Sequence, residues 1–222
     1  LYYRKVWLIM RSRFDEQLSL LNKKMIEMGT ECESIINLSV KALIEGDTTC
    51  AETAKHLRGN IDHMERDIES ICIKLLLQQQ PVARDLRVIS AALKMITDME
   101  RIGDQAENIT DIVASLNGRN DIGCENIRIM AEAAMKMVTK SIDAYVKQDM
   151  ELSNDVINYD DVVDDAFDRV KQNLIKMISE NVSDGEYALD LLMIAKYFEK
   201  IGDHAVNIAE WVEYSLTGVH KG

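Results

Sequence analysis

Residues 100–109 read ERIGDQAENI, and residues 199–208 read EKIGDHAVNI. Seven of these ten positions are identical when the two stretches are aligned without gaps. A repeat of roughly a hundred residues indicates a duplicated domain, because the units of a solenoid are much shorter. The chain has 222 residues, which is enough for two small domains that each bury a modest core.

The composition around this repeat indicates an all-helical protein. Aromatic residues make up 5% of the chain and there is one Pro, whereas sheets favour aromatic residues and their turns use Gly and Pro. Apolar residues at three- and four-residue spacing predict six long helices. The expected helices are about Ser12–Ile44, Thr49–Gln78, Val82–Leu116, Glu125–Lys147, Glu151–Glu180 and Glu186–Leu216. We therefore predict an all-α fold of two tandem, pseudo-symmetric three-helix bundles built from six antiparallel helices.

The expected domain boundaries follow the repeat. Residues 10–118 form the first three-helix repeat and residues 119–218 form the second, with the boundary at Asn117-Gly118. Residues 1–9, LYYRKVWLI, differ from the rest of the chain and are too short to span a membrane or to form a secretory signal. We expect them to be a non-native or disordered leader before a native start at Met10, which the intact mass of the natural protein would test.

Charge and cysteine content restrict the partners and the compartment. The formal charge is −12, so direct nucleic-acid binding is not expected, because it requires clustered Lys and Arg. The acidity instead suits cations or a basic protein surface. The four Cys residues form no Cys-x-x-Cys pair. We expect reduced thiols in a cytoplasmic protein without membrane insertion.

Each repeated stretch places oxygen-bearing side chains four residues apart, on one face of a helix. The two stripes are Glu100, Asp104 and Asn108, and Glu199, Asp203 and Asn207. Carboxylates at this spacing repel by a few tenths of a kcal/mol. Gly103 and Gly202 add about 1 kcal/mol each relative to Ala in a helix interior. Because both costs recur, a bound cation and a close approach of a neighbouring helix would explain the stripe.

The preceding helix in each half can supply facing oxygen atoms. The second half has Asp160 and Asp164 four residues apart, whereas the first half has Arg58 and Asp62, with Glu65 one turn further on. Four carboxylates from two antiparallel helices could hold a hard or borderline cation or a small cluster. The alternative is a solvated acidic face paired with nearby Lys and Arg. Arg58 stands where a ligand is wanted, so the first half is the weaker candidate.

Known catalytic patterns are missing from the sequence. It has no Glu-x-x-His pair of a di-iron bundle, no His-Glu-x-x-His, no Walker A loop and no Gly-x-Ser-x-Gly. His204 follows Asp203, but its counterpart in the first repeat is Gln105, which counts against a shared chemical role. A Gly-rich phosphate cradle is also missing. We predict that the protein is not an enzyme and that it has no phosphate-binding site of its own.

Several motifs in order give a family resemblance. The sequence reads RFDEQL at residues 13–18, QPVARDLR at 80–87 and EKIGDHAVNIAEW at 199–211. With the duplicated stripe, these motifs make the chain resemble the PhoU family from Met10 to about Gly218. The resemblance implies two three-helix bundles, a cytoplasmic location, a homodimer and no enzymatic activity. It also implies an adaptor between the ATPase subunit of the phosphate ABC transporter and a sensor histidine kinase, acting as a negative regulator of the phosphate regulon.

The resemblance further implies bound metal, as an iron cluster or zinc, on paired acidic motifs. Carried over residue by residue, the second site is complete and the first departs from the pattern at Arg58. The implied ligands are Asp160, Asp164, Glu199 and Asp203 in the second repeat, and Asp62, Glu100 and Asp104 in the first. A protein that stores or buffers iron or zinc, and a metal-free helical scaffold, remain the alternatives.

Overall fold

The computed structural model describes residues 2–78, 82–116, 119 and 124–219, with the side chains of these residues from residue 12 onward except Gln78 and Cys124. This part of the chain contains six α-helices, one 3-10 turn and no strand. The elements are α1 (Tyr2–Glu45), α2 (Cys50–Gln78), α3 (Ala83–Ser115), α4 (Cys124–Lys147), α5 (Met150–Glu180), η1 (Val182–Asp184) and α6 (Gly185–Thr217). The all-α prediction is confirmed, and the predicted helices match these ranges closely except at the start of α1.

The helix α1 begins at Tyr2, earlier than the expected start near Ser12. Residues 2–11 contain neither Gly nor Pro, so no residue in this segment interrupts the helix. The interpretation of residues 1–9 as a leader stays a prediction.

The turns that open the second helix of each repeat have the same construction. Gly46 and Gln148 both adopt a positive φ, of 64° and 53°. An Asp follows each of them and accepts from a backbone N–H two residues on: the Thr49 N–H donates to Asp47 Oδ1 at 2.9 Å just before α2, and Asp149 caps α5 by accepting from the Glu151 and Leu152 amides. The duplication therefore extends to the backbone of the turns, although Gly fits the left-handed conformation more easily than Gln.

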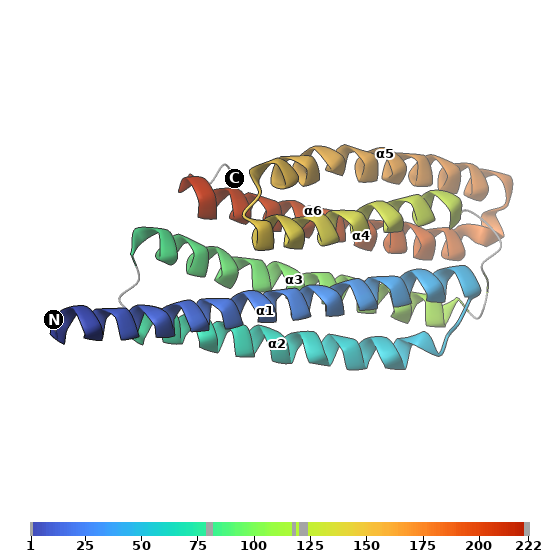
Figure 1. The fold of residues 1–222 in the computed structure, drawn as a ribbon. Helices are drawn as coiled ribbons and strands as arrows, with labels where there is room; N and C mark the ends of the chain where they lie inside the picture. The colour runs from blue at the N-terminus through green and yellow to red at the C-terminus, as the bar shows by residue number, and fades with distance from the viewer. Residues whose placement is uncertain (1, 79–81, 117–118, 120–123, 220–222) are drawn as a thin grey trace.

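Two three-helix bundles lie side by side (Figure 1). The helices α1, α2 and α3 pack together, as do α4, α5 and α6. The bundles meet where α3 packs on α6 and α1 packs on α4, which we call the seam. The helices α2 and α5 lie on the outside, each packed only on helices of its own repeat among the described residues (Figure 1).

The buried positions of the repeated stretch turn its acidic residues away from the core. Ile102 and Ala106 in α3, and Ile201 and Ala205 in α6, are fully buried. The intervening glycines face the outer helices, because a Cβ at Gly103 would contact α2 and one at Gly202 would contact α5. The carboxylate stripes therefore lie along the α2–α3 and α5–α6 contacts.

Three cysteine side chains are free thiols in the protein interior, at Cys32, Cys50 and Cys72. Burial raises the pKa of Cys72 to about 12, which keeps it protonated and unreactive. The side chain of Cys124 lies outside the described residues. None of the described helices combines the length and the apolar character needed to cross a bilayer.

Candidate functional site

In the second repeat, α5 approaches α6 closely at Gly202. A Cβ added there would lie 3.3 Å from Asp160 Oδ1 and 3.7 Å from both methyl groups of Val163. The missing side chain thus leaves room for the Asp160 carboxylate against α6. Its Oδ1 is buried and has no hydrogen-bond partner among the described residues. A buried carboxylate oxygen without a donor is costly, so this position favours a cation.

The carboxylates around Asp160 repel one another. The pKa of Asp160 is raised to about 6, first by burial and then by the negative charges of Asp164, Asp203, Asp161 and Glu199. The pKa of Asp164 is also raised, first by burial and then by Glu199 and Asp203. The four predicted ligands are therefore close enough to interact, and the two on α5 bind protons more readily than ordinary carboxylates. Such a group gains from a bound cation.

The two carboxylates on α6 have lysine partners on their own helix. Lys196 pairs with Glu199, and the Lys200 Nζ lies 2.5 Å from Asp203 Oδ2. Both lysines are 41–44% exposed, and exposed pairs of this kind contribute little to stability. The alternative predicted from the sequence, an acidic face paired with lysines, therefore describes Glu199 and Asp203 on α6. It does not describe Asp160 on α5, whose Oδ1 has no partner among the described residues.

In the first repeat, the guanidinium of Arg58 lies among the three predicted ligands. Its Nη2 donates to Glu100 Oε1 at 2.7 Å and its Nε donates to Asp104. Its Nη1 pairs with Asp62, and the Arg58 side chain is only 15% exposed. The structure therefore brings the three predicted ligands together around a cation that the chain itself supplies.

The residues of the two repeats differ in how they fit a metal ion. Asp160, Asp164, Glu199 and Asp203 offer oxygen donors and an unpaired buried oxygen, which suits a hard or borderline cation. In the first set, the carboxylate oxygens of Asp62, Glu100 and Asp104 pair with Arg58 instead. Within the described part of the chain, no three His, Cys, Asp or Glu side chains are already arranged as a metal centre. Binding at the second set therefore requires its lysines and carboxylates to change rotamer.

The third member of the second stripe belongs to a different contact. Asn207 Nδ2 donates to Asp98 Oδ1 at 3.0 Å, and His204 Nδ1 lies 2.9 Å from the same oxygen. Asp98 is on α3, so Asn207 faces the seam and not the Asp160 set. The single-face prediction was too simple, because four residues exceed one helical turn and each step rotates the position by about 40°. No sequence pattern singled out Asp98, since its contacts depend on how the repeats pack.

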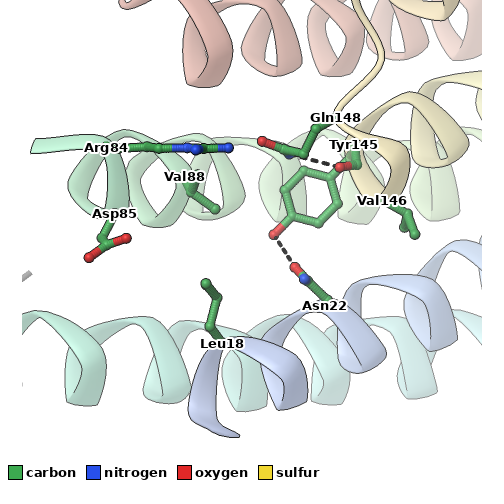
Figure 2. A pocket seen from close by; sticks show the side chains of 8 residues that line it. All are labelled: Leu18, Asn22, Arg84, Asp85, Val88, Tyr145, Val146 and Gln148. Atoms are coloured by element: carbon green, nitrogen blue, oxygen red, sulfur yellow. Dashed lines mark hydrogen bonds between the residues drawn. The ribbon is translucent and has the colours of Figure 1, made fainter. Parts of the chain in front are cut away.

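A separate cavity of about 250 Å³ lies at the seam, and none of the predicted metal ligands lines it (Figure 2). The Tyr145 hydroxyl donates to Asn22 Oδ1 at 3.0 Å, and Gln148 Nε2 donates to the Tyr145 carbonyl at 2.9 Å. Arg84 and Asp85, from the first turn of α3, also line it. The sequence drew attention to these two residues only as part of a motif, and the structure places them where the repeats meet.

Comparison with protein families finds the same duplication. The model of the PhoU domain matches twice, over residues 25–113 and 127–212. Each match contains one of the two carboxylate sets.

Relatives of known name match almost the whole chain. The phosphate-specific transport system accessory protein PhoU homolog of Clostridium acetobutylicum is 35% identical, over 94% of this chain and 96% of its own length. The protein of the same name from Pseudomonas aeruginosa is 32% identical, over 93% of this chain and 86% of its own length.

Two solved structures share the fold. The crystal structure of PhoU from Pseudomonas aeruginosa matches with a TM-score of 0.89 and 32% identity, covering 93% of this chain and 100% of that one. The phosphate transport system regulatory protein PhoU from Streptococcus pneumoniae matches with a TM-score of 0.86, covering 94% of this chain and 99% of that one. At 22% identity, the second likeness concerns the fold alone.

Proposed function

This chain belongs to the PhoU family, and on that premise we propose that it is a non-enzymatic regulator of phosphate uptake and of the phosphate regulon. It acts in the cytoplasm as an adaptor between the ATPase subunit of the phosphate ABC transporter and a sensor histidine kinase, and it keeps the regulon off when phosphate is plentiful. The observation that carries the proposal is the match of both repeats to the family, together with relatives named for phosphate transport over nearly their full length.

The charge and shape of the molecule support an adaptor. The net charge of −12 favours docking to basic protein surfaces. The helices α2 and α5 lie outermost on opposite sides of the molecule and offer long faces to two partners (Figure 1). A homodimer would present each face twice, and light scattering of the purified protein tests that oligomeric state.

Metal binding is the second part of the proposal. Asp160 and Asp164 from α5, with Glu199 and Asp203 from α6, would hold iron or zinc. The bound cation would supply positive charge that joins α5 to α6 and displaces protons from the carboxylates of raised pKa. The supporting observation is the buried, unpartnered Oδ1 of Asp160 beside Gly202.

A metal-free scaffold is the competing function, and the lysine partners of Glu199 and Asp203 favour it. Elemental analysis and thermal melts with and without chelator separate the two. Metal retained by the wild-type chain and lost from Asp160→Asn with Asp203→Asn supports the metal site. Several metals per chain with redox turnover would instead indicate storage.

Deletion of the gene with a phosphate-regulated reporter tests the regulatory role. We expect the reporter to be active in high phosphate after deletion and to be silenced again by a plasmid copy of the gene. A reporter that still responds normally to phosphate after deletion would contradict the proposal. Isothermal titration with orthophosphate is expected to show no tight binding, because phosphate is sensed elsewhere in this scheme.

A further inference from the structure

We propose that Arg58 is a built-in cation that takes the place of a metal ion in the first repeat, so that the first repeat does not bind metal. This inference rests on the proposed function in one respect: it assumes that acidic residues at these positions can bind a metal ion. It concerns a different set of residues from the proposed metal site, so the two can fail separately.

Arg58 contacts the same carboxylate groups that a metal ion would need as ligands. The guanidinium reaches Asp62 on its own helix and both Glu100 and Asp104 on α3. Arg keeps its charge at any physiological pH and presents its N–H groups in a rigid fork that suits carboxylates. One positive charge does not cancel three negative ones, so its effect is to occupy the carboxylate oxygens.

The packing around Arg58 holds the guanidinium in place. A Cβ at Gly103 would lie 3.3 Å from Arg58 Cδ and 2.9 Å from Ile61 Cδ1. The alkyl part of Arg58 therefore crosses α3 at the glycine, and the side chain is 15% exposed. A metal ion would have to displace a partly buried side chain with three ionic contacts.

The same glycine contact identifies the residue that Arg58 replaces. In the second repeat, a Cβ at Gly202 would lie 3.3 Å from Asp160 and 3.7 Å from Val163. Arg58 and Ile61 are three residues apart, as are Asp160 and Val163. Arg58 and Asp160 therefore occupy equivalent positions in the two repeats. At this position the first repeat has a positively charged side chain and the second has a carboxylate.

The remaining acidic neighbours of Arg58 are not arranged to replace it. The pKa of Glu65 is raised by burial and by Glu100, and the pKa of Glu107 is raised by burial and by Asp111, while Arg58 lowers both. These groups add negative charge around the cluster. Without Arg58, Asp62, Glu100 and Asp104 would therefore lose the cation that joins them, and the acidic residues around them would supply no replacement.

The test isolates the first repeat in the full chain. The parent variant carries Asp160→Asn with Asp203→Asn, which removes the second set, and Arg58→Met and Arg58→Glu are added to it separately. The probes are Zn²⁺ and, without oxygen, Fe²⁺, with metal content measured after desalting and melting midpoints measured in EDTA and in metal. Circular dichroism checks that each variant is folded.

We expect the parent to retain no metal and to melt at the same temperature in EDTA and in Zn²⁺. Arg58→Met, which leaves three carboxylates unpaired, should melt at least about 5 °C lower in EDTA and recover in Zn²⁺. Arg58→Glu should retain metal after desalting. Arg58→Lys serves as the matched control, because it keeps the charge without the fork and should melt between Arg58→Met and the parent.

Two results would overturn the inference. One is metal retained by the parent and lost on adding Asp62→Asn with Glu100→Gln, which would place metal in the first repeat despite Arg58. The other is a folded Arg58→Met variant that melts like the parent and gains nothing from metal. A wild-type chain that holds no metal, with Arg58 variants that behave as expected, would refute the metal site of the second repeat and leave the role of Arg58 supported.

Discussion

The two acidic stripes occupy equivalent places in the two repeats, yet they differ in what lies opposite the glycine. In the first repeat, Arg58 reaches across Gly103 to the carboxylates of α3. In the second repeat, Asp160 lies against Gly202 and adds another negative charge. The duplicated backbone therefore sets only the geometry of the site. A single residue on the outer helix decides whether that geometry forms an internal ion-pair cluster, as at Arg58, or gathers further negative charge, as at Asp160.

Moving the arginine to the second repeat should give the largest effect. In Asp160→Arg, the new guanidinium can pair with Asp164, Glu199 and Asp203 as Arg58 does with its own three partners. We expect metal retention after desalting to fall at least about tenfold while the helical content is kept, since the donors are then occupied. Elemental analysis and circular dichroism measure this. Metal content equal to wild type would mean that the two sites are not interchangeable.

Replacing Gly103 or Gly202 with Val should have the next largest effect. Gly103→Val and Gly202→Val each force side chains of the outer helix to move, so we expect unfolding free energies in urea lower by about 2 kcal/mol. The loss should be greater at Gly103, because its Cβ would lie nearer to a neighbour. Gly59→Val is the matched control, since a Cβ at Gly59 meets nothing within 4 Å. Equal losses at all three positions would show only a general effect of Val.

Removing the charge of Asp160 should stabilise the metal-free chain. The pKa of Asp160 is raised to about 6 in the folded state, so its charged form opposes folding above that pH. For Asp160→Asn in EDTA, we expect a gain of about 1 kcal/mol at pH 7.5, discounted for partial solvent exposure.

The effect of Asp160→Asn should depend on pH. Because the folded pKa is raised, the destabilisation by Asp160 is full above about pH 6 and fades as the pH falls toward the ordinary value of 3.8. Urea melts at pH 7.5 and pH 4.5 should therefore show a gain from Asp160→Asn that shrinks at the lower pH. A gain that grows on acidification would contradict the raised pKa.

A change at the seam should have the smallest effect. His204→Gln installs the residue that the first repeat has at Gln105 and removes one contact to Asp98. Since Asn207 still donates to the same oxygen, we expect the unfolding free energy to fall by about 0.5–1 kcal/mol without a change in metal content. Urea denaturation and elemental analysis check both parts. A loss of metal would mean that His204 belongs to the second site.

The sequence was sufficient for most of the fold and for the location of the carboxylate sets. The repeated glycines and the three- and four-residue spacing of apolar residues are local properties, so they predicted six helices and their pairing in two bundles. The role of Arg58 was not predictable in the same way. In the sequence it is a missing ligand, and only the packing of α2 on α3 shows its contacts with Glu100 and Asp104.

The seam was also beyond sequence reasoning. Asp98 has no acidic counterpart in the second repeat, where position 197 is Tyr, so the duplication could not point to it. Its contacts with His204 and Asn207 depend on how one bundle packs on the other. The cavity beside Tyr145 has the same origin, since its walls come from α1, α3 and α4.

The two acidic stripes can be compared in one experiment by anomalous scattering at the metal absorption edge, from crystals of the wild-type chain grown with Zn²⁺. We expect anomalous density beside Asp160, Asp164, Glu199 and Asp203, and ordinary guanidinium density among Asp62, Glu100 and Asp104. Metal density in the first repeat, with Arg58 turned away from its three partners, would contradict it.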